Sequence, residues 1–238
     1  MLFNASVLYT LQQTDVGKPR LKLAFVRRSQ AVLPVDGVFL VIGALVANSS
    51  SSIRLPEIYT WDVAFLPIRN AAREWKVEVD VDYARWESIR NFDVRLFNGV
   101  ILGNPQQWSN AISIGVGTEY RWLSFPGYPA WGVALRTGCL HSQQAIPDVN
   151  FNPAAPDGPS HTLSVGGGFL LHRDRTISRL FDLWIRGGIL RQEGFGIDVA
   201  YQALLFESRT VTGNPNPTVN GTYQTTTHAG SVTMRVNF

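Results

Sequence analysis

The chain has 238 residues, of which 45% are hydrophobic and 16% are charged, and its formal net charge is +3. This length suffices for one large domain, but no stretch reaches the roughly 18 consecutive apolar residues of a membrane-spanning helix. Basic and acidic residues are interleaved in residues 78–90, so no basic patch for nucleic acid is expected. Cys139 is the single cysteine, which excludes a disulfide framework and a cysteine-based metal site.

From the first residues of this sequence we expect no export signal within it. Met1 is followed by Leu2, Phe3 and Asn4, without the basic, apolar and small-residue segments of a signal peptide. If the protein is exported, we expect its beginning to be missing from this sequence. The apolar segment from Val38 to Ala47 is about half as long as a membrane helix, and we interpret it as a strand or part of a loop.

Apolar and polar residues alternate from residue 75 onward with the two-residue period of a strand. Trp75, Val77 and Val79 alternate with Lys76 and Glu78, for example. We expect further strands of this kind within residues 112–122, 131–136, 163–171, 195–202 and 222–238. Each has one apolar and one polar face, which predicts an all-β, antiparallel protein.

The apolar positions change parity between Tyr83 and Phe92. The simplest interpretation is a β-bulge near residues 84–88 within one long strand from Trp75 to Phe97, because one extra residue turns over every later side chain. A turn at the same place is the alternative.

The connections between these strands alternate in length. If the carboxyl terminus lies on the periplasmic side, residues 98–107, 143–159 and 212–221 form long external loops, and residues 12–19, 67–74 and 124–130 form short periplasmic connections. This asymmetry is typical of outer-membrane β-barrels. Residues 173–193 form an unusual long insertion on the short side, which we expect to be a short amphipathic helix or an inserted hairpin.

The last strand ends the chain on an aromatic residue. Val232, Met234, Val236 and Phe238 alternate with polar residues. This ending resembles the signal by which bacterial outer-membrane proteins are inserted, so Phe238 is our candidate contact for the barrel-assembly machinery. On this strand alone, the edge of a soluble β-sandwich is an equal alternative.

Several short motifs resemble the FadL/TodX family of outer-membrane transporters for hydrophobic compounds. The motifs are Arg136-Thr137-Gly138, Ile146-Pro147-Asp148, Pro156-Asp157-Gly158, the stretch 161–166, and, in matching order, residues 55–57, 82–88, 108–120 and 197–201. The chain departs from the family pattern at Ser160, Thr162, Asn110 and Ser113.

The resemblance implies a single domain, residues 1–238, that forms the C-terminal part of a transmembrane β-barrel in the Gram-negative outer membrane. We count about nine of the family's fourteen strands, and expect the hatch and the first strands to have no counterpart here. The implied function is passive uptake of a hydrophobic small molecule, either a long-chain fatty acid or an aromatic hydrocarbon. The implied surroundings are outer-membrane lipid and, since nine antiparallel strands do not close conventionally, a second chain that completes the barrel.

Alternation places three arginines, Arg95, Arg121 and Arg136, on the side of the lumen. A guanidinium group can bind a carboxylate through two hydrogen bonds, so these are our candidate substrate-binding residues. The alternative is that they pair with Glu119, Asp80 or Asp198 across the lumen, as charged residues in barrels ordinarily do.

Other functions remain as alternatives. The chain could be a non-transporting structural fragment or a general porin. A hydrolase would need one of His141, His161, His172 and His228 beside Ser142, Ser160 or Ser164, but no Gly-x-Ser-x-Gly motif is present. We therefore expect no enzyme and no cofactor, and the spacing of histidines and acids indicates no metal site. The glycines 166–168 lie within a strand, where we expect them to allow bending or close approach of a neighbour.

Overall fold

The structure is a computed structural model, which describes residues 3–172 and 194–237. Nearly all of the regular structure in these residues is β-strand, with three short 3-10 turns at 86–88, 148–150 and 217–219. No helix in the described part of the chain is long and apolar enough to cross a membrane.

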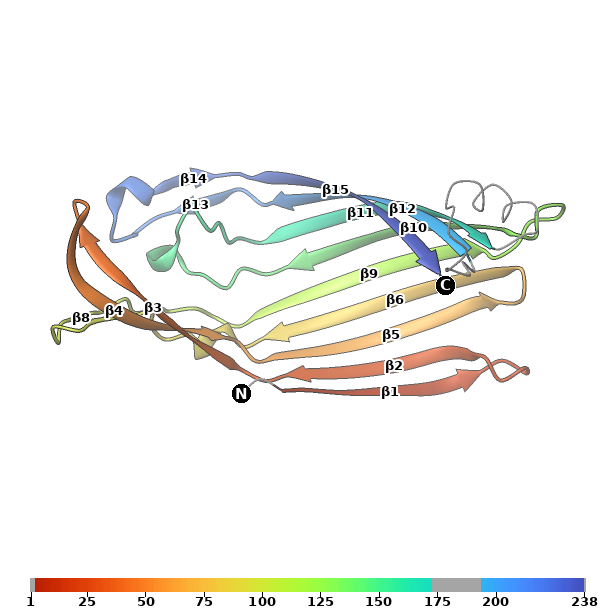
Figure 1. Ribbon diagram of the computed structural model, residues 1–238, viewed down its shortest axis with the longest axis horizontal. Helices are drawn as coiled ribbons and strands as arrows, with labels where there is room; N and C mark the ends of the chain where they lie inside the picture. Colours follow the sequence, from red (N-terminus) through yellow and green to blue (C-terminus); the bar gives the residue numbers. More distant parts are fainter. Residues whose placement is uncertain (1–2, 173–193, 238) are drawn as a thin grey trace, which may run out of the picture.

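Nine strands form one antiparallel sheet in the order β1-β2-β5-β6-β9-β10-β11-β12-β15 (Figure 1). Their bounds are β1 Asn4–Gln13, β2 Pro19–Arg28, β5 Ile58–Arg69, β6 Arg73–Ala84, β9 Ala111–Trp122, β10 Trp131–Ser142, β11 Ser160–His172, β12 Gly194–Phe206 and β15 Thr226–Asn237. Strands of this length can cross a bilayer when tilted. The all-β architecture and the nine strands are confirmed.

The connections sort by length to the two ends of the sheet. Residues 14–18, 70–72 and 123–130 make the short connections at one end, and residues 29–57, 85–110, 143–159 and 207–225 make the long connections at the other. Figure 1 shows the long-loop end on the left. The predicted separation of short and long connections is therefore confirmed. The prediction for residues 173–193 lies outside the described residues.

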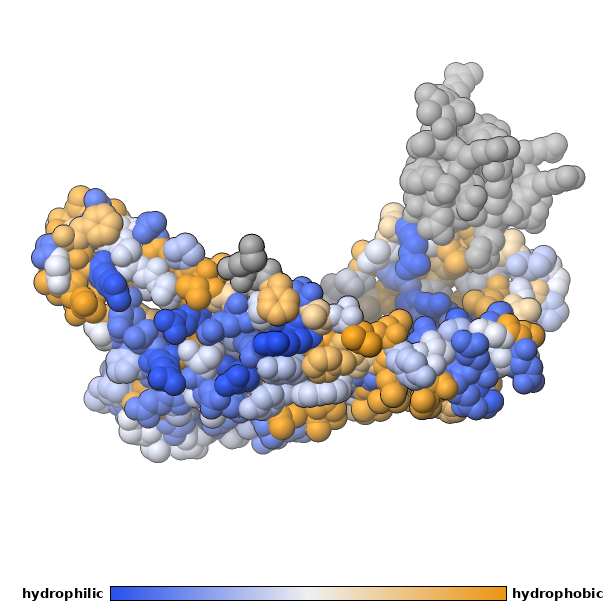
Figure 2. Space-filling model, turned by 90° about the horizontal axis from the view of Figure 1, so that it is seen from below, coloured by the Kyte–Doolittle hydropathy of each residue, from blue (hydrophilic) through white to orange (hydrophobic). Residues whose placement is uncertain are grey.

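Four strands within the long connections form a second sheet, in the order β3-β4-β7-β8. They are β3 Ala31–Val41, β4 Ala44–Leu55, β7 Val94–Leu96 and β8 Ile101–Leu102, and a further small pair joins β13 Arg209–Val211 to β14 Gly221–Tyr223. Figure 1 places the β3–β4 hairpin at the long-loop end, and Figure 2 shows this end, on the left, standing out from the rest of the sheet. The apolar segment 38–47 thus forms the tip of this hairpin.

The long strand predicted from Trp75 to Phe97 was wrong. β6 ends at Ala84, a 3-10 turn follows at Trp86–Ser88, and β7 pairs with β4 in the second sheet. The alternative, a turn, is what the chain adopts. A change of parity is expected both from a bulge and from a chain that leaves the sheet, so the pattern alone did not separate them.

The two faces of the nine-stranded sheet reverse the burial pattern of a water-soluble protein. The apolar side chains of one face are exposed, as for Leu135 (53%), Leu163 (51%) and Val232 (66%), whereas Glu119 (8%) and Thr162 (9%) on the other are buried. We call these the outer and inner faces. A large exposed apolar surface marks contact with a membrane or another chain, and alternating apolar-out, polar-in strands are typical of membrane barrels.

Candidate functional site

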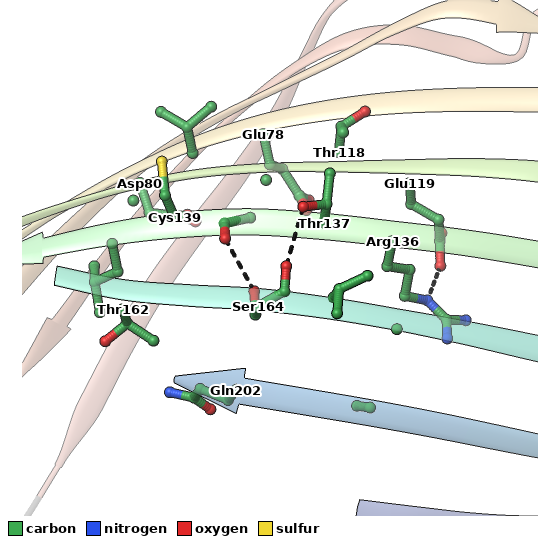
Figure 3. A pocket seen from close by; sticks show the side chains of 18 of the residues that line it. Glu78, Asp80, Thr118, Glu119, Arg136, Thr137, Cys139, Thr162, Ser164 and Gln202 are labelled. Carbon is green, nitrogen blue, oxygen red and sulfur yellow. Dashed lines mark hydrogen bonds and ion pairs between the residues drawn. The ribbon is translucent and has the colours of Figure 1, made fainter. Parts of the chain in front are cut away.

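The inner face lines an open cavity of about 820 Å³. Side chains from eight of the nine strands line it, from Arg28 on β2 to Thr233 on β15, so the sheet must curve around this space. Figure 3 shows polar residues of the lining, among them Glu78, Asp80, Glu119, Arg136, Thr162, Ser164 and Gln202. The cavity is the polar inside of the curved wall.

Arg136 on β10 lies at the centre of this wall. Its Nε donates to Glu119 on β9, and its Nη1 donates to Oδ1 of Asp198 on β12 at 2.6 Å. Glu119 is the direct register partner of Arg136, but Asp198 lies two strands away, across β11. The guanidinium group therefore links three strands of the wall.

Gly168 makes this link across β11 sterically feasible. It is the register partner of both Ala134 and Asp198, and a Cβ at position 168 would overlap the Asp198 carboxylate and lie 3.4 Å from Nη1 of Arg136. The absence of a side chain leaves the space through which Arg136 and Asp198 meet. The expectation that glycines 166–168 allow a neighbour to approach closely is confirmed at Gly168.

Further ion pairs extend the network along the wall. Nε of Arg121 lies 2.7 Å from Oε1 of Glu119, and its Nη1 lies 3.6 Å from Oε1 of Glu74. Nη2 of Arg235 lies 3.2 Å from Oδ2 of Asp198. We call this set the charge band; it comprises Glu74, Glu119, Arg121, Arg136, Asp198 and Arg235, and crosses the inner face from β6 to β15.

The structure brings together two of the three predicted arginines. Arg121 and Arg136 share Glu119 within the charge band. Arg95 lies instead in β7, opposite Ser50 of the second sheet, and its placement on a long wall strand was wrong because that strand ends at Ala84. Glu119 and Asp198 form ion pairs with Arg136, as the alternative interpretation of these arginines expects. Asp80 instead lies opposite Asp62 on β5.

The part of the inner face beyond the charge band is acidic. Thr60 on β5 donates to Asp82 on β6, and Nζ of Lys76 lies 2.6 Å from Oε2 of Glu78. Asp62 and Asp80 face each other on the same two strands. An anionic solute would meet repulsion here, and attraction only where arginines are exposed.

A second, smaller cavity of about 320 Å³ lies at the long-loop end. We call it the mouth pocket; its lining includes Trp86, Trp108, Ala145 and Ile146 beside Asp82 and Ser113. The rings of Trp86 and Trp108 have centroids 5.4 Å apart, which favours an apolar, aromatic surface. Sequence analysis missed this pocket because its tryptophans lie in connections rather than in alternating strands.

Arg209 holds the long loops around the mouth pocket. It is 8% exposed, and it donates to the Asp148 carboxylate at 2.8 Å and to the backbone oxygens of Asp157 and Ile146 at 2.6 and 2.8 Å. The Asp157 side chain accepts from the backbone N–H groups of Ala145 and Ile146. The hydrogen bond from Arg209, helped by one from the Thr212 N–H, lowers the pKa of Asp148 below its ordinary value.

Two of the histidines considered for hydrolysis, His161 and His228, pair with residues other than serine. Nε2 of His161 lies 3.0 Å from Oε1 of Glu207, and Nδ1 of His228 lies 2.7 Å from the Tyr201 hydroxyl. Ser142 shares a hydrogen bond with Ser113. Among the described residues, no histidine is positioned to activate a serine by a direct hydrogen bond.

Comparison with known proteins supports the membrane interpretation of this wall. A family profile described as outer membrane protein transport protein (OMPP1/FadL/TodX) matches residues 18–184. No curated protein matches. A solved structure, the crystal structure of a Pseudomonas aeruginosa FadL homologue, is similar in fold with a TM-score of 0.63 and 16% sequence identity.

The structural match covers 91% of this chain and 48% of the FadL homologue, so the chain spans about half of that protein's length. The profile match covers well over half of the chain. Together with a nine-stranded wall that is apolar outside and polar inside, it shows that this chain belongs to the FadL/TodX family of outer-membrane transport proteins.

Proposed function

We propose that this chain forms part of a wall through which hydrophobic small molecules enter across the outer membrane. The observation that carries the proposal is the mouth pocket, whose tryptophan surface opens beside the polar inner face. Apolar pockets with a few polar groups suit small, mostly apolar ligands. A solute would leave water at the mouth pocket and then pass along the inner face.

The solute classes that fit are long-chain fatty acids and aromatic hydrocarbons. A fatty acid would engage Arg121 and Arg136 through its carboxylate, in competition with Glu119. Arg121 is the more accessible of the two, with 42% of its side chain exposed against 35% for Arg136. An aromatic hydrocarbon would use the mouth pocket alone, since it carries no charge for the arginines.

The wall also requires partners at its edges. Within the described strands, β1 and β15 have a neighbour on one side only. Unpaired backbone groups are costly in lipid, so these edges require further strands, from the same protein or a second chain. Insertion would rely on the barrel-assembly machinery, with Phe238 as its contact; that residue lies outside the described part of the chain.

Uptake measurements test this proposal. Cells or proteoliposomes that carry the protein should take up a labelled long-chain fatty acid or toluene faster than a sugar of similar mass. Trp108→Ala should slow hydrophobic uptake by up to about tenfold, equivalent to about 1.4 kcal/mol of lost ring contact. Trp131→Ala is the matched control, since Trp131 is 42% exposed at the other end of β10.

The alternatives give different results in the same experiment. A general porin would pass the sugar as readily as the hydrophobic solute, and a structural fragment would pass neither. Equal effects of Trp108→Ala and Trp131→Ala would contradict the role assigned to the mouth pocket.

A further inference from the structure

Two histidines and one glutamate meet on the outer face at the long-loop end. His141 is the last residue but one of β10, His161 is the second residue of β11, and Glu207 directly follows β12. One nitrogen or oxygen from each residue lies within 4.8 Å of those of the others. We call these three residues the rim cluster. They are separated by 20 and 46 residues in sequence, so no local spacing revealed them.

The backbone fixes the positions of the three side chains. His141 and His161 are direct register partners across the β10–β11 pair, and His161 in turn lies opposite Leu205 on β12. The N–H of Glu207 donates to the Pro159 oxygen at 2.9 Å, which holds the end of β12 beside the start of β11. Ligands held on paired strands in this way need little reorganisation to bind a small ion.

The three side chains of the rim cluster have donor atoms that could bind an added ion. Nε2 of His161 lies 3.0 Å from Oε1 of Glu207, and both side chains are about half exposed, at 52% and 51%. The His141 and His161 rings have centroids 4.8 Å apart. Nδ1 of His141 is enclosed and has no hydrogen-bond partner among residues 3–172 and 194–237. A simple ion pair between His161 and Glu207 would leave this nitrogen of His141 unexplained.

We propose that the rim cluster is a binding site for one divalent transition-metal ion, with Zn²⁺ as its representative. Two imidazoles and one carboxylate are a common zinc donor set, with a fourth position left for water. Tetrahedral bonds of about 2.0–2.1 Å place ligand atoms roughly 3.3 Å apart. His161 and Glu207 already meet that spacing, and His141 reaches it by a small side-chain adjustment from within the 4.8 Å limit.

Binding would join three elements at the long-loop end. His141 precedes the loop 143–159, His161 follows it, and Glu207 begins the connection 207–225. An ion that binds only the folded arrangement stabilises it by mass action. The bound ion would therefore fasten the outer ends of β10, β11 and β12 to one another.

Zinc titration of the purified, chelator-stripped full chain in detergent tests the proposal. Isothermal calorimetry should give one Zn²⁺ per chain, and Co²⁺ should give the visible absorption of a low-coordinate site. His161→Ala and Glu207→Gln should each weaken binding by at least about tenfold, since changes even to residues behind a metal ligand have effects of that size. Zn²⁺ should also raise the melting temperature of the unaltered chain but not of Glu207→Gln.

His228→Ala is the matched control, because His228 is an exposed histidine on the adjacent β15 that pairs with Tyr201 instead. It should leave zinc binding unchanged. Absence of stoichiometric binding would overturn the proposal, as would an effect of His228→Ala equal to that of His161→Ala. Glu207→Gln preserves side-chain size at an exposed position, so it keeps the test valid even where a histidine variant fails to fold.

Discussion

Gly168 has a structural role that could not be predicted from its being a glycine. The space at this position lets Arg136 reach Asp198 across an intervening strand, and this contact links the two halves of the charge band. Ion pairs at a wet surface contribute little, but Glu119 and Asp198 have only 10% and 22% of their side chains exposed. Separating these carboxylates from Arg136 should therefore be costly.

Gly168→Val should lower the free energy of unfolding by about 1–3 kcal/mol, the cost of leaving a charged hydrogen-bonding group without its partner. Unfolding by urea in detergent, followed by electrophoretic mobility, measures this change. Gly167→Val is the matched control, because a Cβ there meets its nearest atoms at an ordinary 3.7 Å. Equal destabilisation by the two variants would show that the Arg136–Asp198 contact is not the cause.

Asp148 makes the loop structure around the mouth pocket sensitive to acid. Its pKa is lowered in the folded chain, chiefly by Arg209, so its contribution to stability is complete above the unfolded pKa of about 3.9 and is lost as the pH falls through the lowered folded value. Pepsin cleavage within residues 143–159 should accordingly increase on acidification over that range.

Asp148→Asn should remove this dependence on pH and leave the loop susceptible to pepsin throughout. Asp15→Asn, in the exposed short turn at the other end of the sheet, should behave as the unaltered chain does. If Asp148→Asn and the unaltered chain show the same pH profile, the Asp148–Arg209 contact does not hold the loop.

Among the elements, the β3–β4 hairpin exposes apolar side chains to an unusual degree. Ile42 at its tip is fully exposed and has φ +50°, a left-handed conformation that is strained for a β-branched residue. Val38, Leu40 and Leu45 beside it are more than half exposed. An apolar tip at the long-loop end suits a role in first contact with a hydrophobic solute.

Ile42→Asn separates the two properties of this position, since asparagine tolerates the left-handed conformation but offers no apolar surface. We expect stability to hold or rise, while uptake of a hydrophobic solute at limiting concentration falls by up to about tenfold, the equivalent of about 1.4 kcal/mol of lost burial. Ile101→Asn on β8, which is 59% exposed but has ordinary backbone geometry, is the control. Unchanged uptake by Ile42→Asn would exclude the hairpin tip from solute capture.

The elements also show what the sequence could and could not predict. A strand that separates lipid from a polar cavity has side chains that alternate every two residues. The wall strands from β6 onward, their faces and the two arginines Arg121 and Arg136 therefore followed from alternation alone, whereas β1, β2 and β5 did not. The exit of the chain after Ala84 produced the same parity change as a bulge, and this placed Arg95 wrongly. The Arg209 contacts and the rim cluster join residues on different strands and loops, and such contacts depend on register that no local pattern encodes.

At the scale of the whole molecule, the nine-stranded sheet is a polar-inside, apolar-outside wall with two edges among the described strands. The buried apolar residues of the described chain lie largely in the connections at the long-loop end, where Ile89, Phe151 and Val211 are at most 5% exposed. The membrane-facing part thus has little core of its own and relies on strand pairing and on lipid. This arrangement matches a chain whose wall is completed by further strands.

Alternate cysteine labelling along β12 tests the membrane orientation of this wall most directly. In a Cys139→Ser background, single cysteines replace Val199, Ala200, Tyr201 and Gln202, all of which are exposed in the isolated sheet. In outer membranes, a water-soluble maleimide should label Ala200→Cys and Gln202→Cys on the inner face, and spare Val199→Cys and Tyr201→Cys on the outer face. Equal labelling of all four positions, or the reverse pattern, would contradict a wall with lipid outside and water inside.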